Sequence, residues 1–132
     1  LRTRTGPKDP AMRSARVCYD HLAGDMAVRI FDSLQARGFL AVSADKGGLG
    51  LTEDGKDFVS GFGIDLAALA SGRRPLCRAC LDWSERRNHL AGSLGAAFLS
   101  RFQDKGWLRR DKDSRVVHIS PRGDSELRKL FF

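Results

Sequence analysis

The chain contains an internal repeat, and this repeat constrains the fold more than any other feature. The sequence His-Leu-Ala-Gly occurs at residues 21–24 and again at residues 89–92, so the two copies are 68 positions apart. The same ungapped shift aligns further identical residues, namely Gln35/Gln103, Gly38/Gly106, Leu40/Leu108, Asp45/Asp113 and Gly55/Gly123. Self-similarity at a fixed period indicates a duplicated supersecondary unit.

The length of the chain fits one compact domain or two closely packed half-domains, and its charge favours a polyanionic partner. The chain has 132 residues and begins at Leu1 rather than Met, so we expect a fragment of a longer protein, with residues 1–10 as a linker. A net charge of +7 favours nucleic acid among possible partners, although a basic surface without such a partner fits equally well. Three cysteines, an odd number, favour a reduced cytoplasmic setting over a disulfide framework. No apolar run approaches the roughly 18 residues of a transmembrane helix, so we expect no membrane partner.

Each repeat is expected to contain a helix, a second helix, a β-hairpin and a third helix. Helical spacing of apolar residues predicts helices over 11–22 and 25–37, and again over 76–90 and 93–105. Each second helix ends at a glycine, a polar hairpin follows, and Thr52 or Ser120 caps the third helix. A short helical segment is predicted at 65–71, between the repeats. The expected fold class is therefore α+β, mainly helical, with two tandem winged-helix-like repeats at 11–72 and 73–132.

Two sets of residues carry a resemblance to known proteins. Residues 34–40 with 51–55, and residues 102–108 with 119–123, resemble the second half of a winged helix, in which a recognition helix, a two-stranded wing and a capped helix follow one another. Residues 15–24 and 74–92 look like the C-terminal region of a group of bacterial ArsR-type helix-turn-helix transcriptional regulators. In that group an N-terminal winged helix reads DNA.

The resemblance implies a regulatory domain, either effector-sensing or oligomerising, rather than the DNA reader itself. Its implied partners are the N-terminal DNA-binding domain of the parent chain, DNA through the parent protein, and a second copy in a homodimer. Two alternatives stay open: a winged-helix module that binds DNA directly through its second repeat, and a purely structural dimerisation scaffold. No phosphate-binding loop, zinc-protease motif or nucleophile elbow is present, so we predict no enzymatic activity and no catalytic residue.

Sulfur and imidazole are the most specific candidate ligands in the sequence. The candidate metal ligands are Cys18, His21, Cys77, Cys80 and His89. Thiolate and neutral imidazole bind zinc and similar thiophilic metals, and ArsR-type regulators include many metal sensors. Against this, the shift of 68 does not repeat the cysteines, and buried structural roles explain a cysteine on an apolar stripe equally simply. The residues alone favour the structural interpretation, and thus no cofactor.

Two further sites are predicted from the sequence. An effector pocket between the units would include Cys18, His21, Trp83 and His89, with the repeated histidines facing each other across the duplication. A basic hairpin could contact a nucleic-acid backbone through Arg109, Arg110, Lys112 and Arg115. Asp111 and Asp113 interrupt this hairpin, which favours a solvated charged surface instead.

Overall fold

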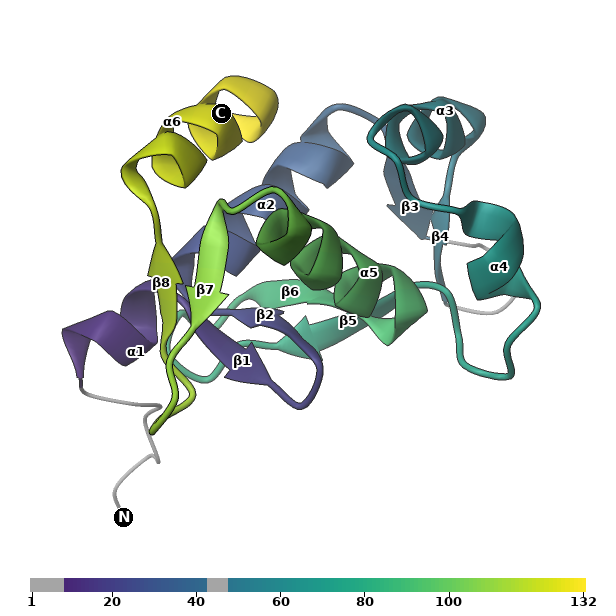
Figure 1. Cartoon of the computed structure of the whole chain (residues 1–132). Helices are drawn as coiled ribbons and strands as arrows, with labels where there is room; N and C mark the ends of the chain where they lie inside the picture. The colour runs from purple at the N-terminus through teal and green to yellow at the C-terminus, as the bar shows by residue number, and fades with distance from the viewer. Residues whose placement is uncertain (1–8, 43–47) are drawn as a thin grey trace, which may run out of the picture.

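The computed structural model describes residues 9–42 and 48–132, and its architecture is a duplicated α+β unit (Figure 1). The first unit contains α1 (Pro10–Ser14), β1 (Arg16–Cys18), β2 (His21–Ala23), α2 (Asp25–Ala36), β3 (Leu40–Val42), β4 (Leu49–Leu51) and α3 (Glu53–Gly61), and it is followed by α4 (Leu66–Ala70). The second unit contains β5 (Arg78–Leu81), β6 (Asn88–Ala91), α5 (Gly92–Asp104), β7 (Leu108–Arg110), β8 (Val117–Ile119) and α6 (Pro121–Phe131). Consecutive strands pair as antiparallel hairpins.

The shift of 68 found in the sequence relates α2 to α5, the hairpin β3–β4 to β7–β8, and α3 to α6. The hydrogen bonds repeat as well. Thr52 caps α3 by accepting the N–H of Gly55 at 3.0 Å, and Ser120 caps α6 by accepting the N–H of Gly123 at 2.9 Å. Both predicted caps are therefore confirmed, and the duplication extends to the local hydrogen bonding.

The second predicted helix of each repeat is confirmed, and both helices end for the same reason. Gly38 follows α2 with a φ of 74°, and Gly106 follows α5 with a φ of 73°, in the left-handed region that favours glycine. Their buried residues follow helical spacing, with Met26, Ile30 and Leu34 on α2. The short helix predicted at 65–71 is also present, as α4.

The prediction of a leading helix in each repeat was wrong. Residues 11–22 form the short helix α1 and then the hairpin β1–β2, and the segment 76–90 forms most of the hairpin β5–β6. All residues of β2 and all but the first residue of β6 are buried. These strands therefore lack the alternation of apolar and polar residues that marks a half-exposed strand. Each unit is therefore hairpin, helix, hairpin, helix, and a tandem winged-helix arrangement is not confirmed.

One apolar core joins the two units. Helix α5 packs against β2 of the first unit, α2 packs against β6 of the second unit, and β2 also contacts β6. Figure 1 shows the hairpins β1–β2 and β5–β6 side by side, with α5 lying over them. This reciprocal packing brings the two His-Leu-Ala-Gly sequences together at the centre of the molecule.

The chain ends contribute unequally to this core. Phe131 near the end of α6 is buried and lies edge-on to Phe58, Phe98 and Phe102, whereas the terminal Phe132 is half exposed. Of the predicted linker 1–10, residues 1–8 lie outside the described residues; Asp9 caps α1 and Pro10 begins it. The turn of the hairpin predicted to follow the first glycine stop, residues 44–48, also lies almost wholly outside them. No helix in the described part of the chain has the length and apolar character needed to cross a membrane.

Candidate metal centre

Each of the two central hairpins places a cysteine opposite a histidine. In β1–β2, Cys18 pairs with His21 across a tight turn whose first residue, Tyr19, has a left-handed φ of 57°. In β5–β6, Cys80 pairs with His89. Directly paired residues in an antiparallel hairpin project to the same face, so each hairpin presents one sulfur and one imidazole together.

The four side chains converge between the hairpins. One ligand atom from each of Cys18, His21, Cys80 and His89 lies within 4.8 Å of all the others. The two histidines meet through their Nε2 atoms, which are 3.0 Å apart. His21 is 5% exposed and His89 is 1% exposed, whereas both cysteines are only partly buried. The prediction that the repeated histidines face each other is confirmed.

The ring of His89 is oriented by Asp82. His89 Nδ1 lies 3.1 Å from Asp82 Oδ2, and the Asp82 side chain is completely buried. Asp82 also accepts the N–H of Gly24 at 2.5 Å and the hydroxyl of Ser84 at 2.7 Å, and it forms an ion pair with Arg16 at 3.1 Å. Burial opposes ionisation, but these donors and the guanidinium hold the pKa of Asp82 well below its usual range. The carboxylate is therefore ionised and accepts the Nδ1–H of His89.

His21 has an equivalent partner in Asp20. His21 Nδ1 lies 3.3 Å from Asp20 Oδ1, and Arg74 donates to the other carboxylate oxygen at 2.5 Å. Despite the opposing effect of burial, the hydrogen bonds from Arg74 and His21 lower the pKa of Asp20. Many metal-binding histidines donate Nδ1–H to a carboxylate in this way. The carboxylate fixes the tautomer in which Nε2 is unprotonated and can bind the metal.

Both histidines are neutral at neutral pH. Burial lowers the pKa of His21, although Asp20 counteracts it. Burial and the facing His21 lower the pKa of His89 to about 4, although Asp82 counteracts them. The two Nε2 atoms lie within hydrogen-bonding distance, so one ring can donate an Nε2–H to the other. In the tautomer that carries both protons on Nδ1, both Nε2 lone pairs are free to bind a cation.

The dimensions of this cluster suit a tetrahedral ion. Zinc bonds of about 2.0–2.1 Å to nitrogen and about 2.3 Å to sulfur place the ligand atoms about 3.3–3.8 Å apart. The widest separation in the protein, 4.8 Å, thus exceeds those of a closed site by about 1.0–1.5 Å. A surface hollow of about 460 Å³ reaches Cys18, His21 and Cys80, so the cluster is accessible from solvent.

Cys77 lies apart from the other four predicted ligands. It is buried beside a different hollow, whose lining includes Phe31 and Asn88, and burial raises the pKa of its thiol to about 11. Cys77 and Cys80 are three positions apart in extended chain, and such residues point to opposite faces. The Cys-x-x-Cys spacing therefore does not bring its two sulfurs to one site.

The sequence argument against a repeated cysteine pair was wrong. Cys18 and Cys80 occupy equivalent positions, each opposite the repeated histidine. Two residues lie between Cys18 and His21, whereas eight lie between Cys80 and His89. An ungapped shift cannot align the cysteines across loops of different length. The strand pairing in the structure shows this equivalence, because each cysteine lies opposite a repeated histidine.

The other predicted site residues are spread over the surface. Trp83 is 54% exposed with Arg86 over its ring, and it is not among the residues that line the hollow beside Cys18. Arg109, Arg110, Lys112 and Arg115 are all exposed on the hairpin β7–β8 and its turn. The Asp111 carboxylate accepts bonds from the Asp113 N–H and the Ser114 hydroxyl at the tip of this hairpin. The turn segment of the hairpin is tied to the first unit, because Val17 N–H donates to Arg115 O.

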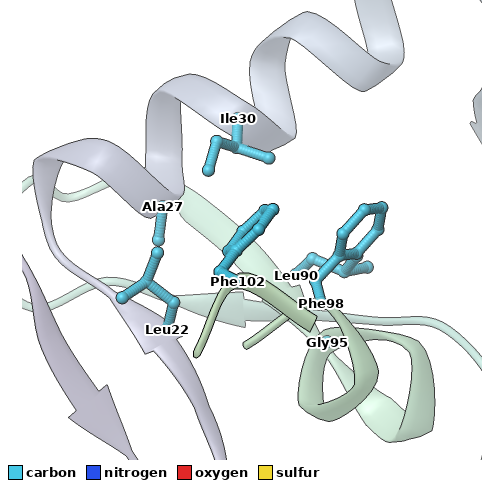
Figure 2. Close-up of a pocket in the computed structure, with 7 residues that line it drawn as sticks. All are labelled: Leu22, Ala27, Ile30, Leu90, Gly95, Phe98 and Phe102. Carbon is cyan, nitrogen blue, oxygen red and sulfur yellow. The ribbon is translucent and has the colours of Figure 1, made fainter. Parts of the chain in front are cut away.

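A small apolar cavity lies between the two units. It measures about 20 Å³ and is lined by Leu22, Ala27, Ile30, Leu90, Gly95, Phe98 and Phe102 (Figure 2). Figure 2 shows these side chains coming from α2, α5 and both central hairpins. An apolar space of this size has no polar partner for a water molecule. The lining comes from both units and includes none of Cys18, His21, Cys80 and His89.

Comparison with known proteins gives one informative match. No family model matches the chain, and no solved structure matches it significantly. Over 109 residues, 83% of the chain, it is 40% identical to YdfF of Bacillus subtilis (strain 168), which is named an uncharacterized HTH-type transcriptional regulator. The chain is similar to a transcriptional regulator. The match covers 47% of that protein, so the chain spans about half the length of this curated relative.

Proposed function

We propose that this chain is the C-terminal, effector-sensing region of an ArsR-type helix-turn-helix transcriptional regulator. The similarity to a regulator about twice its length supports this role, because a separate part of such a protein would carry the DNA reader. The observation that carries the proposal is the buried polar cluster at the junction of the two units, where His21 and His89 meet at 3.0 Å. Polar groups are costly to bury, and a purely structural junction is more simply built from apolar residues.

The packing suggests how a bound effector acts. Since α2 rests on β6 and α5 rests on β2, a ligand held between the hairpins changes the relative placement of both helices. Effector binding regulates DNA affinity only when it favours one of two packings, and the resulting coupling is reciprocal. The proposed partners are the DNA-binding domain of the same longer chain, DNA through that domain, and a second copy in a homodimer.

A competing function is direct DNA binding by the second repeat. The exposed cations of β7–β8 favour it, since a basic wing can follow phosphates. Two observations weigh against it. Asp111 lies within the wing, and Arg101 of α5 is engaged in a hydrogen bond to the carbonyl of Phe62 at 3.0 Å. In the helix that would have to enter the major groove, the cation of the last turn is therefore already bound within the protein.

The sensing role and the DNA-binding role predict different affinities of this chain by itself for DNA. Fluorescence anisotropy with duplex DNA over a series of salt concentrations measures the number of phosphates contacted, from the slope of log affinity against log salt. A sensing region is expected to show no binding at low salt. Binding with a slope that falls when Arg109, Arg110, Lys112 and Arg115 are all replaced by Gln would overturn the sensing role in favour of the DNA-binding module.

A further inference from the structure

We infer that Cys18, His21, Cys80 and His89 form a four-coordinate site for a zinc-like divalent metal ion, bound by two sulfurs and two Nε2 atoms. This inference rests on the proposed function only for its regulatory consequence. The site itself follows from the four donor atoms, which lie within 4.8 Å of one another in the described part of the chain.

The donor set selects the class of metal. Thiolate and imidazole suit zinc and other borderline or soft ions, whereas magnesium and calcium require oxygen ligands. Sulfur binds these ions as thiolate, so coordination forms two metal–sulfur and two metal–nitrogen bonds, and each coordinating thiol gives up its proton to solvent. Two thiolates then neutralise the charge of the divalent ion.

The surroundings of the histidines are already arranged for metal binding. Asp82 and Asp20 lie beside the two Nδ1 atoms, and the tautomer in which they accept both Nδ1 protons presents two unprotonated Nε2 atoms at one position. A metal bound by both rings replaces the Nε2–Nε2 contact with two coordinate bonds. The fully buried Asp82, held by Gly24 and Arg16, makes this orientation rigid for His89.

The site links the two halves of the duplication. Each hairpin supplies one cysteine and one histidine, so neither unit can complete the coordination without the other. A metal ion therefore cross-links β1–β2 to β5–β6, the hairpins against which α5 and α2 pack. Within the proposed function, the ion is the effector that stabilises one packing of the units.

Cobalt(II) titration of the reduced, chelator-treated chain tests the site directly. We expect one equivalent to bind with sulfur-to-cobalt charge transfer and the intense d–d bands of tetrahedral coordination, and zinc should displace it. Cys18→Ser and Cys80→Ser should each weaken binding at least about 100-fold, since even an outer-shell partner is worth 10–100-fold. Cys77→Ala removes a thiol outside the cluster and should leave the spectrum and affinity unchanged. No charge-transfer band, or equal losses in Cys77→Ala and Cys18→Ser, would overturn the site.

Two further measurements remain decisive if a cysteine variant fails to fold. In the wild-type chain, one equivalent of zinc should protect Cys18 and Cys80 from iodoacetamide, read by mass spectrometry; unchanged alkylation of both would overturn the site. In Asp20→Asn the tetrahedral cobalt spectrum should persist while affinity falls about 10–100-fold, as expected for a positioning residue. An unchanged affinity for cobalt would show that Asp20 does not position His21 for metal binding.

Failure of the site and failure of the proposed function give different results. Absence of metal binding by this chain overturns the metal site and leaves sensing of another effector standing. Metal binding without any change in the DNA affinity of a longer regulator carrying this region confirms the site and overturns the ion's role as the effector.

Discussion

Replacement of Asp82 by Asn is expected to destabilise the protein more than any other single charge-neutralising change at the junction. Asp82 is completely buried and paired with Arg16, which is itself 4% exposed. Asn keeps the size of the side chain but leaves the guanidinium without a counter-charge. Breaking a buried pair in this way costs about 3–5 kcal/mol, a large part of the roughly 5–15 kcal/mol that stabilises a typical domain.

The effect should depend on pH with a definite sign. The pKa of Asp82 is held below that of an unfolded aspartate, about 3.9, so its contribution is fully present above that pH. The contribution is lost as the pH falls through the folded-state pKa. Wild type and Asp82→Asn should therefore differ most at neutral pH, and the difference should shrink in acid.

Urea unfolding followed by circular dichroism, repeated between neutral and acidic pH, measures the loss of stability in Asp82→Asn and its dependence on pH. Asp111→Asn is a matched control, since Asp111 also accepts several hydrogen bonds but lies at an exposed hairpin tip, and it should change stability far less. A loss below about 1 kcal/mol for Asp82→Asn at neutral pH, or a loss that does not vary with pH, would refute the reasoning about the buried pair.

Three further outcomes are expected. Gly92→Ala should lower stability by about 1–3 kcal/mol, because the φ of Gly92 is 81° and an added Cβ would lie 2.7 Å from two carbonyl oxygens; thermal unfolding should show no loss for the control Gly61→Ala, where a Cβ has open space. Cys77 should react with iodoacetamide far more slowly in the native protein than in urea, because burial raises its thiol pKa to about 11; equal rates would contradict its placement. Ser120→Ala removes the α6 cap and should cost about 1 kcal/mol by urea unfolding, and an unchanged midpoint would contradict the capping role.

The helices that were predicted from the sequence have one face in the core and one face in solvent. Helix α2 buries Met26, Ile30 and Leu34 and exposes Arg29 between them, so its period is visible in the sequence. The caps and glycine stops likewise depend on a few neighbouring residues. Strands β2 and β6 lie in the centre of the molecule, where long-range contacts with α5 and α2 decide their conformation and no alternation is visible.

The candidate site was predictable only in part. The repeat identified His21 and His89 because two units that pack on each other bring equivalent residues together. The cysteines could not be paired from the sequence, since the turn between Cys80 and His89 is longer than the turn after Cys18. Asp82 gave no local signal, because it contacts Gly24 and Arg16, 58 and 66 positions away.

X-ray absorption at the zinc edge of the zinc-treated chain measures the coordination at the junction most directly. Two sulfur atoms at about 2.3 Å and two nitrogen atoms at about 2.0–2.1 Å are expected when Cys18, His21, Cys80 and His89 bind one ion together. A shell of oxygen and nitrogen without sulfur, or a protein that retains no zinc after gel filtration, would contradict a metal centre shared by the two units.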